Sequence, residues 1–141
     1  MADKVTVEWK GNMLFESDNP REGDHKVLMD ANKENGGNNE GLGPKAMMLS
    51  SLAGCSGLDV VSVLKKMKVT VDDFKMEVNG ELTDEHPKYY HTVSVDYHFY
   101  GKDLDQAKCE RAVNLSIEKY CGVMEMFRRF AEVKIKLHFH N

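Results

Sequence analysis

Three thiols carry the most distinctive chemistry in this sequence: Cys55, Cys109 and Cys121. A thiolate is a nucleophile, and two thiols that meet in a cleft can form and break a disulfide reversibly. Cys55 stands between two glycines in an apolar stretch, and Cys121 stands just before Gly122, at a helix break. These two settings suggest redox chemistry, which requires that the fold bring Cys55 and Cys121 together.

Each cysteine also has a simpler interpretation. Cys55 could be a buried free cysteine that packs as a small hydrophobe, and Cys121 could be a core residue at a helix end. Because a glycine inside a helix costs about 1 kcal/mol relative to alanine, Gly54 and Gly57 suggest that something approaches the backbone closely beside Cys55. If Cys121 begins a short helix, the unpaired N–H groups there favour its thiolate. Cys109 shares a helical face with apolar residues, so we interpret it as a packing residue.

A reactive thiolate also needs a cation nearby. Arg21 lies in an early loop that could fold over the thiols, and it is one candidate. Arg128 and Arg129, which lie close to Cys121 in sequence, are alternative candidates to Arg21. By default each of these arginines is a solvated surface charge.

Composition excludes several classes of function. The net charge of −4 argues against broad nucleic-acid binding. No uninterrupted apolar run approaches the roughly 18 residues of a membrane span, and the N-terminus lacks the apolar core of a signal peptide. We therefore expect a cytoplasmic protein, in which cysteines are more often free, catalytic or metal-binding than paired in structural disulfides. His98, His138 and His140 could share an outer face, but no ligand spacing around them matches a metal site, and we expect neither metal nor cofactor.

The elements that position the thiols follow from hydrophobic periodicity. A chain of 141 residues should form one domain with a real core. In chain order we expect N-terminal strands over 1–31, a mobile loop rich in glycine and asparagine over 32–43, a central helix over 44–66, a hairpin over 70–101, a second helix over 103–120 and a C-terminal strand over 130–140. This β-β-β-α-β-β-α-β order is an α+β fold with a long central helix.

Local sequence patterns predict further details of three of these elements. The helix over 44–66 is apolar nearly all round, so it should be buried on several sides. Val5, Val7 and Trp9 alternate with polar residues, which is the pattern of a half-buried strand. Asp103, with a glutamine three residues on, predicts the start of the second helix, and a short extra helix can follow its end over 123–128.

The segment from Gly43 to Gly122 resembles the OsmC/Ohr family, the osmotically inducible and organic-hydroperoxide-resistance proteins. The residues that carry this resemblance are Gly43-Pro44-Lys45-Ala46 leading to Leu52-Ala53-Gly54-Cys55, then Leu58-Asp59-Val60-Val61, Gly80-Glu81 with Glu85-His86-Pro87, and Ala112-Val113-Asn114-Leu115-Ser116 leading to Glu118-Lys119-Tyr120-Cys121.

The resemblance implies an intertwined homodimer in which two central helices pack back to back. It also implies that Cys55 is the peroxidatic thiol and Cys121 the resolving thiol. An organic hydroperoxide would oxidise Cys55 to a sulfenic acid, Cys121 would condense with it, and an external dithiol would reduce the disulfide. In the best-characterised peroxidases of the family a glutamate pairs with the activating arginine, but this chain has Lys45 at that position. Lys45 therefore joins Arg21 as a candidate for stabilising the thiolate.

Three functions stay open at this point. The first is a thiol-dependent peroxidase that reduces organic hydroperoxides in oxidative stress defence. The second is a non-enzymatic OsmC-like stress protein that binds a small lipophilic ligand in the dimer cleft. The third is a stress-induced structural protein whose cysteines are inert. Turnover of hydroperoxide with a dithiol reductant separates the first from the other two.

Overall fold

The computed structural model describes residues 2–19 and 21–141, so that Met1 and Pro20, both within the predicted N-terminal strands, lie outside it. The chain forms two compact units, Met1–Met48 and Leu49–Asn141. The element order is the predicted β-β-β-α-β-β-α-β, with an additional short helix before the last strand. The α+β class with a long helix and two small sheets is confirmed.

The N-terminal unit contains a three-stranded antiparallel sheet in the order β1-β2-β3. Its strands are β1 (Thr6–Trp9), β2 (Phe15–Asp18) and β3 (Val27–Met29). The prediction of a half-buried first strand is wrong, since Val5, Val7 and Trp9 are 62%, 47% and 66% exposed. Within the described part of this unit, no long helix packs over that face of the sheet.

The loop after β3 is organised around one carboxylate. Asp30 accepts hydrogen bonds from the backbone amides of Ala31, Asn38 and Glu40 at 2.8, 3.1 and 3.1 Å. These bonds, the one from Glu40 foremost, lower the pKa of Asp30. A short 3₁₀ turn, η1 (Lys33–Asn35), lies inside the loop. The segment over 32–43, predicted to be an aperiodic mobile loop, is thus folded around a buried acceptor.

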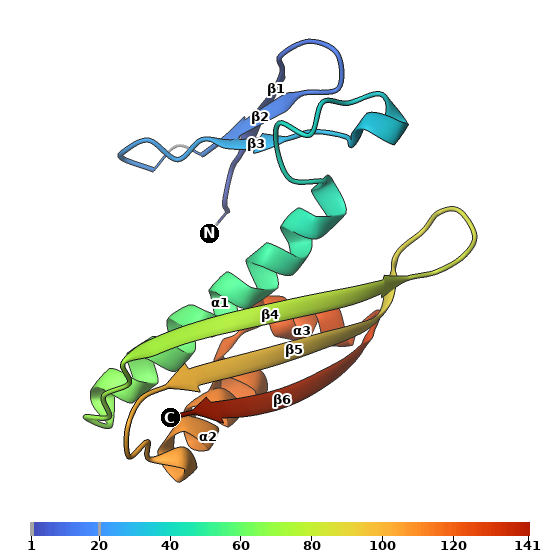
Figure 1. The fold of residues 1–141 in the computed structure, drawn as a ribbon. Coiled ribbons are helices and arrows are strands. Elements are labelled where there is room, and N and C mark those ends of the chain that lie inside the picture. Colours follow the sequence, from blue (N-terminus) through green and yellow to red (C-terminus); the bar gives the residue numbers. More distant parts are fainter. Residues whose placement is uncertain (1, 20) are drawn as a thin grey trace. The chain divides into compact units, whose positions relative to one another are not determined.

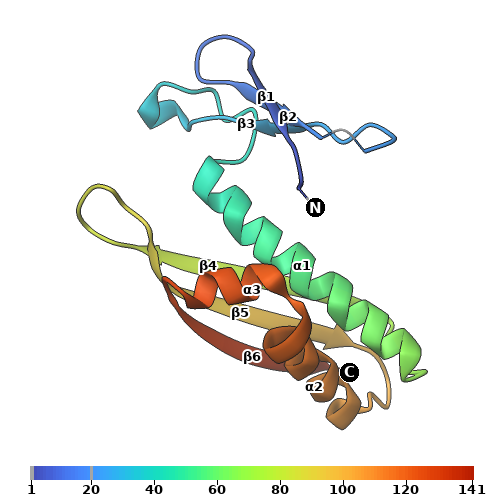
Figure 2. The same ribbon diagram turned by 180° about the vertical axis from the view of Figure 1, so that it is seen from behind.

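The C-terminal unit is a three-stranded sheet covered by helices on one face. The central strand β5 (Tyr90–Tyr100) pairs antiparallel with β4 (Asp73–Leu82) and parallel with β6 (Glu132–His140). A parallel neighbour requires a crossover connection, which is supplied by α2 (Gln106–Leu115), a π-helical turn η2 (Ser116–Tyr120) and α3 (Gly122–Arg128). In Figure 1 the sheet lies in front of α1, α2 and α3, and in Figure 2 the helices lie in front of the sheet.

The long helix α1 (Pro44–Lys66) supplies one wall of this core. Proline suits the first helical turn, and Lys65 and Lys66 in the last turn complement the helix dipole. The buried side chains that pack together are Leu52, Val60, Val63 and Leu64 of α1, Val93, Val95, Tyr97 and Phe99 of β5, Cys109, Ala112 and Val113 of α2, and Met124 and Phe127 of α3.

Within this chain α1 is not buried all round, and cover of its other face by a second subunit stays a prediction. One face packs on the sheet, whereas Leu58 and Val61 on another face are 76% and 43% exposed. By length and composition α1 could cross a membrane, with a mean hydropathy of 1.6 over its most apolar window. In this structure it is a packing helix, because its buried residues contact β5 and the crossover helices.

Two local expectations need correction. The cap of α2 is Asp105, not Asp103: Asp105 Oδ1 accepts from the Lys108 amide at 3.1 Å, while Asp103 has a left-handed φ of 55° that places it before the helix. The regular part of this helix also ends at Leu115, where the π-helical turn begins, rather than continuing to residue 120.

Candidate functional site

The fold brings Cys55 and Cys121 close together. Cys55 lies in the middle of α1 and is partly exposed, while Cys121 is 3% exposed at the start of α3. The Cys55 thiol is near enough to Cys121 to raise the pKa of that residue. All three cysteines of the chain are described, and all are free thiols. The pair singled out by sequence is therefore a pair in space, whereas Cys109 is fully buried in the core.

The π-helical turn η2 sets the position of Cys121. The Cys121 amide donates to the Ser116 carbonyl at 2.8 Å, which closes the wide turn. Cys121 then caps α3, because its Sγ accepts from the Met124 amide at 3.3 Å. The expectation that Cys121 begins a short helix is confirmed. Single π turns inside helical segments occur frequently at functional sites.

The helix start favours the Cys121 thiolate as expected, because the Met124 amide lowers the pKa of Cys121, but other causes outweigh it. Burial first, and then the Cys55 thiol, raise the pKa of Cys121 to about 12. The charges of Cys55 and Asp59 act in the same direction as burial. Cys121 is consequently held as a neutral thiol at physiological pH, which makes it a donor toward Cys55.

A buried chain of hydroxyl groups lies beside the two thiols. The Tyr97 hydroxyl is 2.6 Å from Ser56 Oγ, and Ser56 Oγ is 2.8 Å from Ser116 Oγ. Ser116 Oγ donates to Asp59 Oδ2 at 3.0 Å. Ser56, Tyr97 and Ser116 are fully buried. Burial, with smaller contributions from the charges of Cys121 and Asp59, raises the pKa of Tyr97 to about 12, although the hydrogen bond with Ser56 opposes the rise.

The two glycines beside Cys55 have different surroundings. A side chain at Gly57 would begin 3.3 Å from Met76 Sδ of β4, so the predicted close approach is found there. A side chain at Gly54 would meet no atom within 4 Å among the residues that the structure describes. Gly54 thus lies on the open face of α1.

The candidate cations are distributed over both units. Arg21 and Lys45 are exposed residues of the N-terminal unit, and the two cysteines belong to the C-terminal unit. Arg128 donates to the Ile117 carbonyl at 2.6 Å and pairs with Glu125 at 3.2 Å. Arg128 therefore braces the π-helical turn that leads to Cys121.

Comparison with known proteins decides the family. The model of the family described as OsmC-like protein matches residues 36–136. The chain belongs to the OsmC-like family. Protein YhfA of Escherichia coli K12 is 32% identical to it over 130 residues, which are 92% of this chain and 92% of that protein.

Solved structures show that this OsmC-like chain has the family fold. A hypothetical protein from Aquifex aeolicus superimposes with a TM-score of 0.85 at 29% identity, over 99% of this chain and 96% of that chain. The organic hydroperoxide resistance protein OhrB of Bacillus subtilis superimposes with a TM-score of 0.67 at 21% identity, over 97% of this chain and 98% of that chain.

The OsmC-like chain carries a second polar cluster on the outer face of its C-terminal sheet. His98 Nδ1 lies 2.9 Å from His140 Nε2, and its other ring nitrogen lies 2.9 Å from Glu77. His138 Nε2 lies 2.7 Å from Asp96. Within residues 2–19 and 21–141 no three His, Cys, Asp or Glu side chains are arranged to hold a metal ion.

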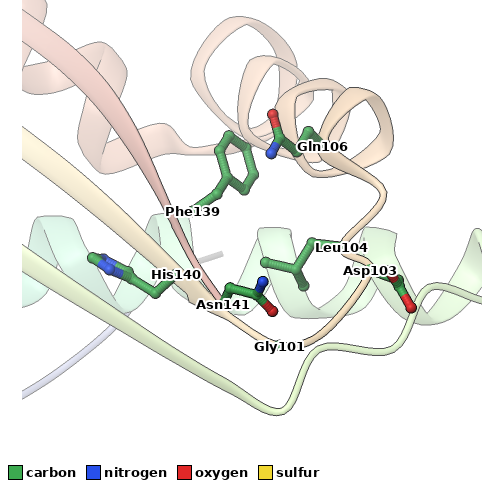
Figure 3. Close-up of a pocket in the computed structure, with 7 residues that line it drawn as sticks. All are labelled: Gly101, Asp103, Leu104, Gln106, Phe139, His140 and Asn141. Atoms are coloured by element: carbon green, nitrogen blue, oxygen red, sulfur yellow. The ribbon is translucent and has the colours of Figure 1, made fainter.

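A small polar hollow lies where β5 and β6 end (Figure 3), and it is separate from the thiol pair. Its lining residues are Gly101, Asp103, Leu104, Gln106, Phe139, His140 and Asn141. Phe139 and His140 leave β6 in opposite directions in this view, as strand alternation requires. The hollow contains no cysteine, so it is not part of the candidate site.

Sequence reasoning found the thiols of this OsmC-like protein but missed the hydroxyl chain. Two signals were available. Asp59 is the one acidic residue in the sequence of α1, and Ser56 is a polar residue directly after Cys55 on a largely apolar helix. Neither signal identifies Tyr97 or Ser116 as a partner, because both come from other elements.

Proposed function

We propose that this OsmC-like protein is a cytoplasmic, thiol-dependent peroxidase that reduces organic hydroperoxides. The observation that carries the proposal is that a partly exposed Cys55 and a buried Cys121 stand on two elements joined by the Ser56–Ser116 hydrogen bond at 2.8 Å. Two thiols held close together can close to a disulfide without a large movement of the backbone. The name of the B. subtilis structural relative, an organic hydroperoxide resistance protein, supports this substrate class.

The chemistry runs in three balanced steps. Cys55 sulfur attacks the hydroperoxide and the O–O bond breaks. The products are a Cys55 sulfenic acid and an alcohol, whose oxygen takes up the proton released by the thiol. Cys121 sulfur then attacks Cys55 sulfur, the S–O bond breaks, and the Cys121 proton leaves with the hydroxyl as water. An external dithiol finally reduces the disulfide and is itself oxidised to a disulfide.

Exposure and protonation favour Cys55 as the thiol that meets the substrate. Cys55 is partly exposed, whereas Cys121 is 3% exposed. The raised pKa of Cys121, about 12, keeps it in the less nucleophilic thiol form until a sulfenic acid is present. These differences support a peroxidatic Cys55 and a resolving Cys121.

Arg21 and Lys45 stay the candidates for activating Cys55. Both are exposed cations, and neither has a carboxylate partner within 4.0 Å among the described residues. Arg21→Gln and Lys45→Gln should each be compared with wild type for the rate of Cys55 oxidation. The variant that slows oxidation identifies the activating cation.

The open face of α1 supports the homodimer. Leu58 is 76% exposed and Val61 is 43% exposed, and Gly54 beside them leaves room for another backbone to approach. Together with Phe74 they line an apolar groove. Leu58→Glu should convert the dimer to a monomer in sedimentation velocity, and a wild-type protein that sediments as a monomer would contradict the assembly.

The function is tested by consumption of an alkyl hydroperoxide with dithiothreitol as the reductant. Wild type should turn over, and Cys55→Ser should lose turnover, while Cys109→Ala serves as the matched control at a cysteine outside the pair. Cys55→Ser turnover as fast as wild type would rule the peroxidase out. Binding of a lipophilic probe that survives loss of both Cys55 and Cys121 would instead support the non-enzymatic alternative.

A further inference from the structure

The buried hydroxyl chain connects the two elements that carry the thiols. Ser56 follows Cys55 on α1, and Ser116 opens the π-helical turn that ends before Cys121. Their hydroxyl oxygens are 2.8 Å apart, and both are fully buried. A second contact, from Ser116 Oγ to the Ser56 carbonyl at 3.4 Å, joins the same two elements. The backbones on which the thiols sit are thus joined through two serines.

The hydrogen bonds of this chain run in one direction. The Asp59 carboxylate can only accept, so Ser116 donates to it. Each serine hydroxyl has one proton to donate, so Ser56 donates to Ser116 and in turn accepts from the Tyr97 hydroxyl. The chain begins at a phenol on β5 and ends at a charged acceptor on α1.

Ser116 has two separate tasks in this arrangement. Its carbonyl accepts the Cys121 amide at 2.8 Å, which fixes the wide turn, and its side chain fastens that turn to α1. Removing the hydroxyl would leave the turn intact but would release it from Ser56 and Asp59. The side chain thus controls the placement of Cys121 relative to Cys55 rather than the local backbone.

We propose that Ser116 and Asp59 are positioning residues for the resolving thiol: together they hold the π-helical turn on α1, so that Cys121 stays close to Cys55. The inference rests on the proposed function for its biological meaning. In the resolving step the S–S bond forms as the S–O bond of the sulfenic acid breaks, and the proton held on Cys121 leaves in the water. The positioning raises the effective concentration of Cys121 at Cys55.

Asp59 adds an electrostatic part to this role. The titratable groups that act on Cys121 are Cys55 and Asp59, both from α1, and Cys121 in turn acts on Tyr97 of β5. The Asp59 carboxylate opposes a second negative charge on Cys121 and so helps to raise the pKa of that thiol. Asp59→Asn keeps an oxygen that can accept from Ser116 but removes the charge. This substitution separates the electrostatic role from the mechanical one.

The mechanical role is tested by the equilibrium of the Cys55–Cys121 disulfide in a glutathione redox buffer, which requires no hydroperoxide. Ser116→Ala should shift this equilibrium toward the dithiol by about tenfold, the loss expected for a buried hydrogen bond. Ser94→Ala, a serine on the outer face of β5, is the matched control and should not shift it. A Ser116→Ala equilibrium equal to that of the control would overturn the mechanical role.

The electrostatic role is tested by the pH profile of Cys121 alkylation in a Cys55→Ser background. Asp59→Asn should move the profile toward lower pH, and an unchanged profile would overturn the role. If Ser116→Ala does not fold, Tyr97→Phe breaks the same chain at its far end and should shift the disulfide equilibrium in the same direction. If the wild-type protein consumes no hydroperoxide, the proposed function is refuted. The disulfide equilibrium and the alkylation profile still show whether Ser116 and Asp59 position Cys121.

Discussion

Two polar clusters lie on opposite faces of the C-terminal sheet, and they differ in what surrounds them. The inner cluster joins Tyr97, Ser56, Ser116 and Asp59 beneath the thiols, and three of these side chains are fully buried. The outer cluster consists of ring stacks among His98, His138, His140 and Tyr100, with Glu77 and Asp96 as ion-pair partners.

The two clusters differ in their access to solvent. On the outer face solvent can replace a lost partner, so each interaction there contributes little to stability. In the inner cluster a lost partner leaves a buried group unsatisfied, which costs its full desolvation. The outer cluster has more titratable groups, yet the inner one joins the two elements that carry Cys55 and Cys121. Burial and a connection to these elements, rather than the number of ionisable groups, therefore distinguish the candidate site.

The largest expected contrast is in thiol reactivity. At pH 8 iodoacetamide should label Cys121 at least about 100-fold more slowly than an ordinary exposed thiol, because a pKa of about 12 leaves little thiolate. Peptide mapping by mass spectrometry measures the ratio of Cys121 to Cys55 labelling. His98→Gln on the outer face should leave this ratio unchanged. Rapid labelling of Cys121 in the native protein would contradict the interpretation that burial holds it as a neutral thiol.

A smaller contrast is expected in stability. Tyr97→Phe removes the first donor of the inner chain and should lower the free energy of unfolding by about 1–3 kcal/mol. His138→Gln removes an ion pair with Asp96 on the outer face and should lower it by less than about 1 kcal/mol. Urea denaturation of the two variants gives both values. Equal losses would show that solvent access does not separate the clusters.

A third contrast is expected at alkaline pH. Cys121 and Tyr97 have pKa values raised from 9.0 and 10.0 to about 12, so the folded state holds their protons more tightly than the unfolded state does. Their contribution is complete below pH 9 and is lost as pH rises toward 12. The unfolding free energy should therefore fall over this window, and it should fall less steeply for Tyr97→Phe. Parallel curves for the two proteins would contradict this assignment.

Much of the architecture follows from local sequence. The proline at the start of α1, the apolar alternation of β5 and β6 and the helix break before Gly122 each reflect a local physical preference, and each appears in the structure. The cap of α2 shows the limit of such reasoning. Asp103 and Asp105 are both good caps, and the backbone before the helix, with its left-handed Asp103, decides between them.

Part of the candidate site could also be predicted from local sequence. The setting of each thiol is local, so Cys55 and Cys121 could be found without a structure. The contacts of Tyr97 and Ser116 depend on how β5 and the π-helical turn pack against α1, which periodicity does not encode. The exposure of Val7 and Trp9 was missed because alternation shows only that a strand has an apolar face, not that the chain covers it.

Whether Cys55 and Cys121 form one redox unit is tested most directly by peptide mapping without reductant after one equivalent of an alkyl hydroperoxide. We expect a Cys55–Cys121 disulfide within a single chain, with Cys109 still a free thiol. Oxidised Cys55 that never links to Cys121, or thiols that all stay reduced, would contradict a shared redox role.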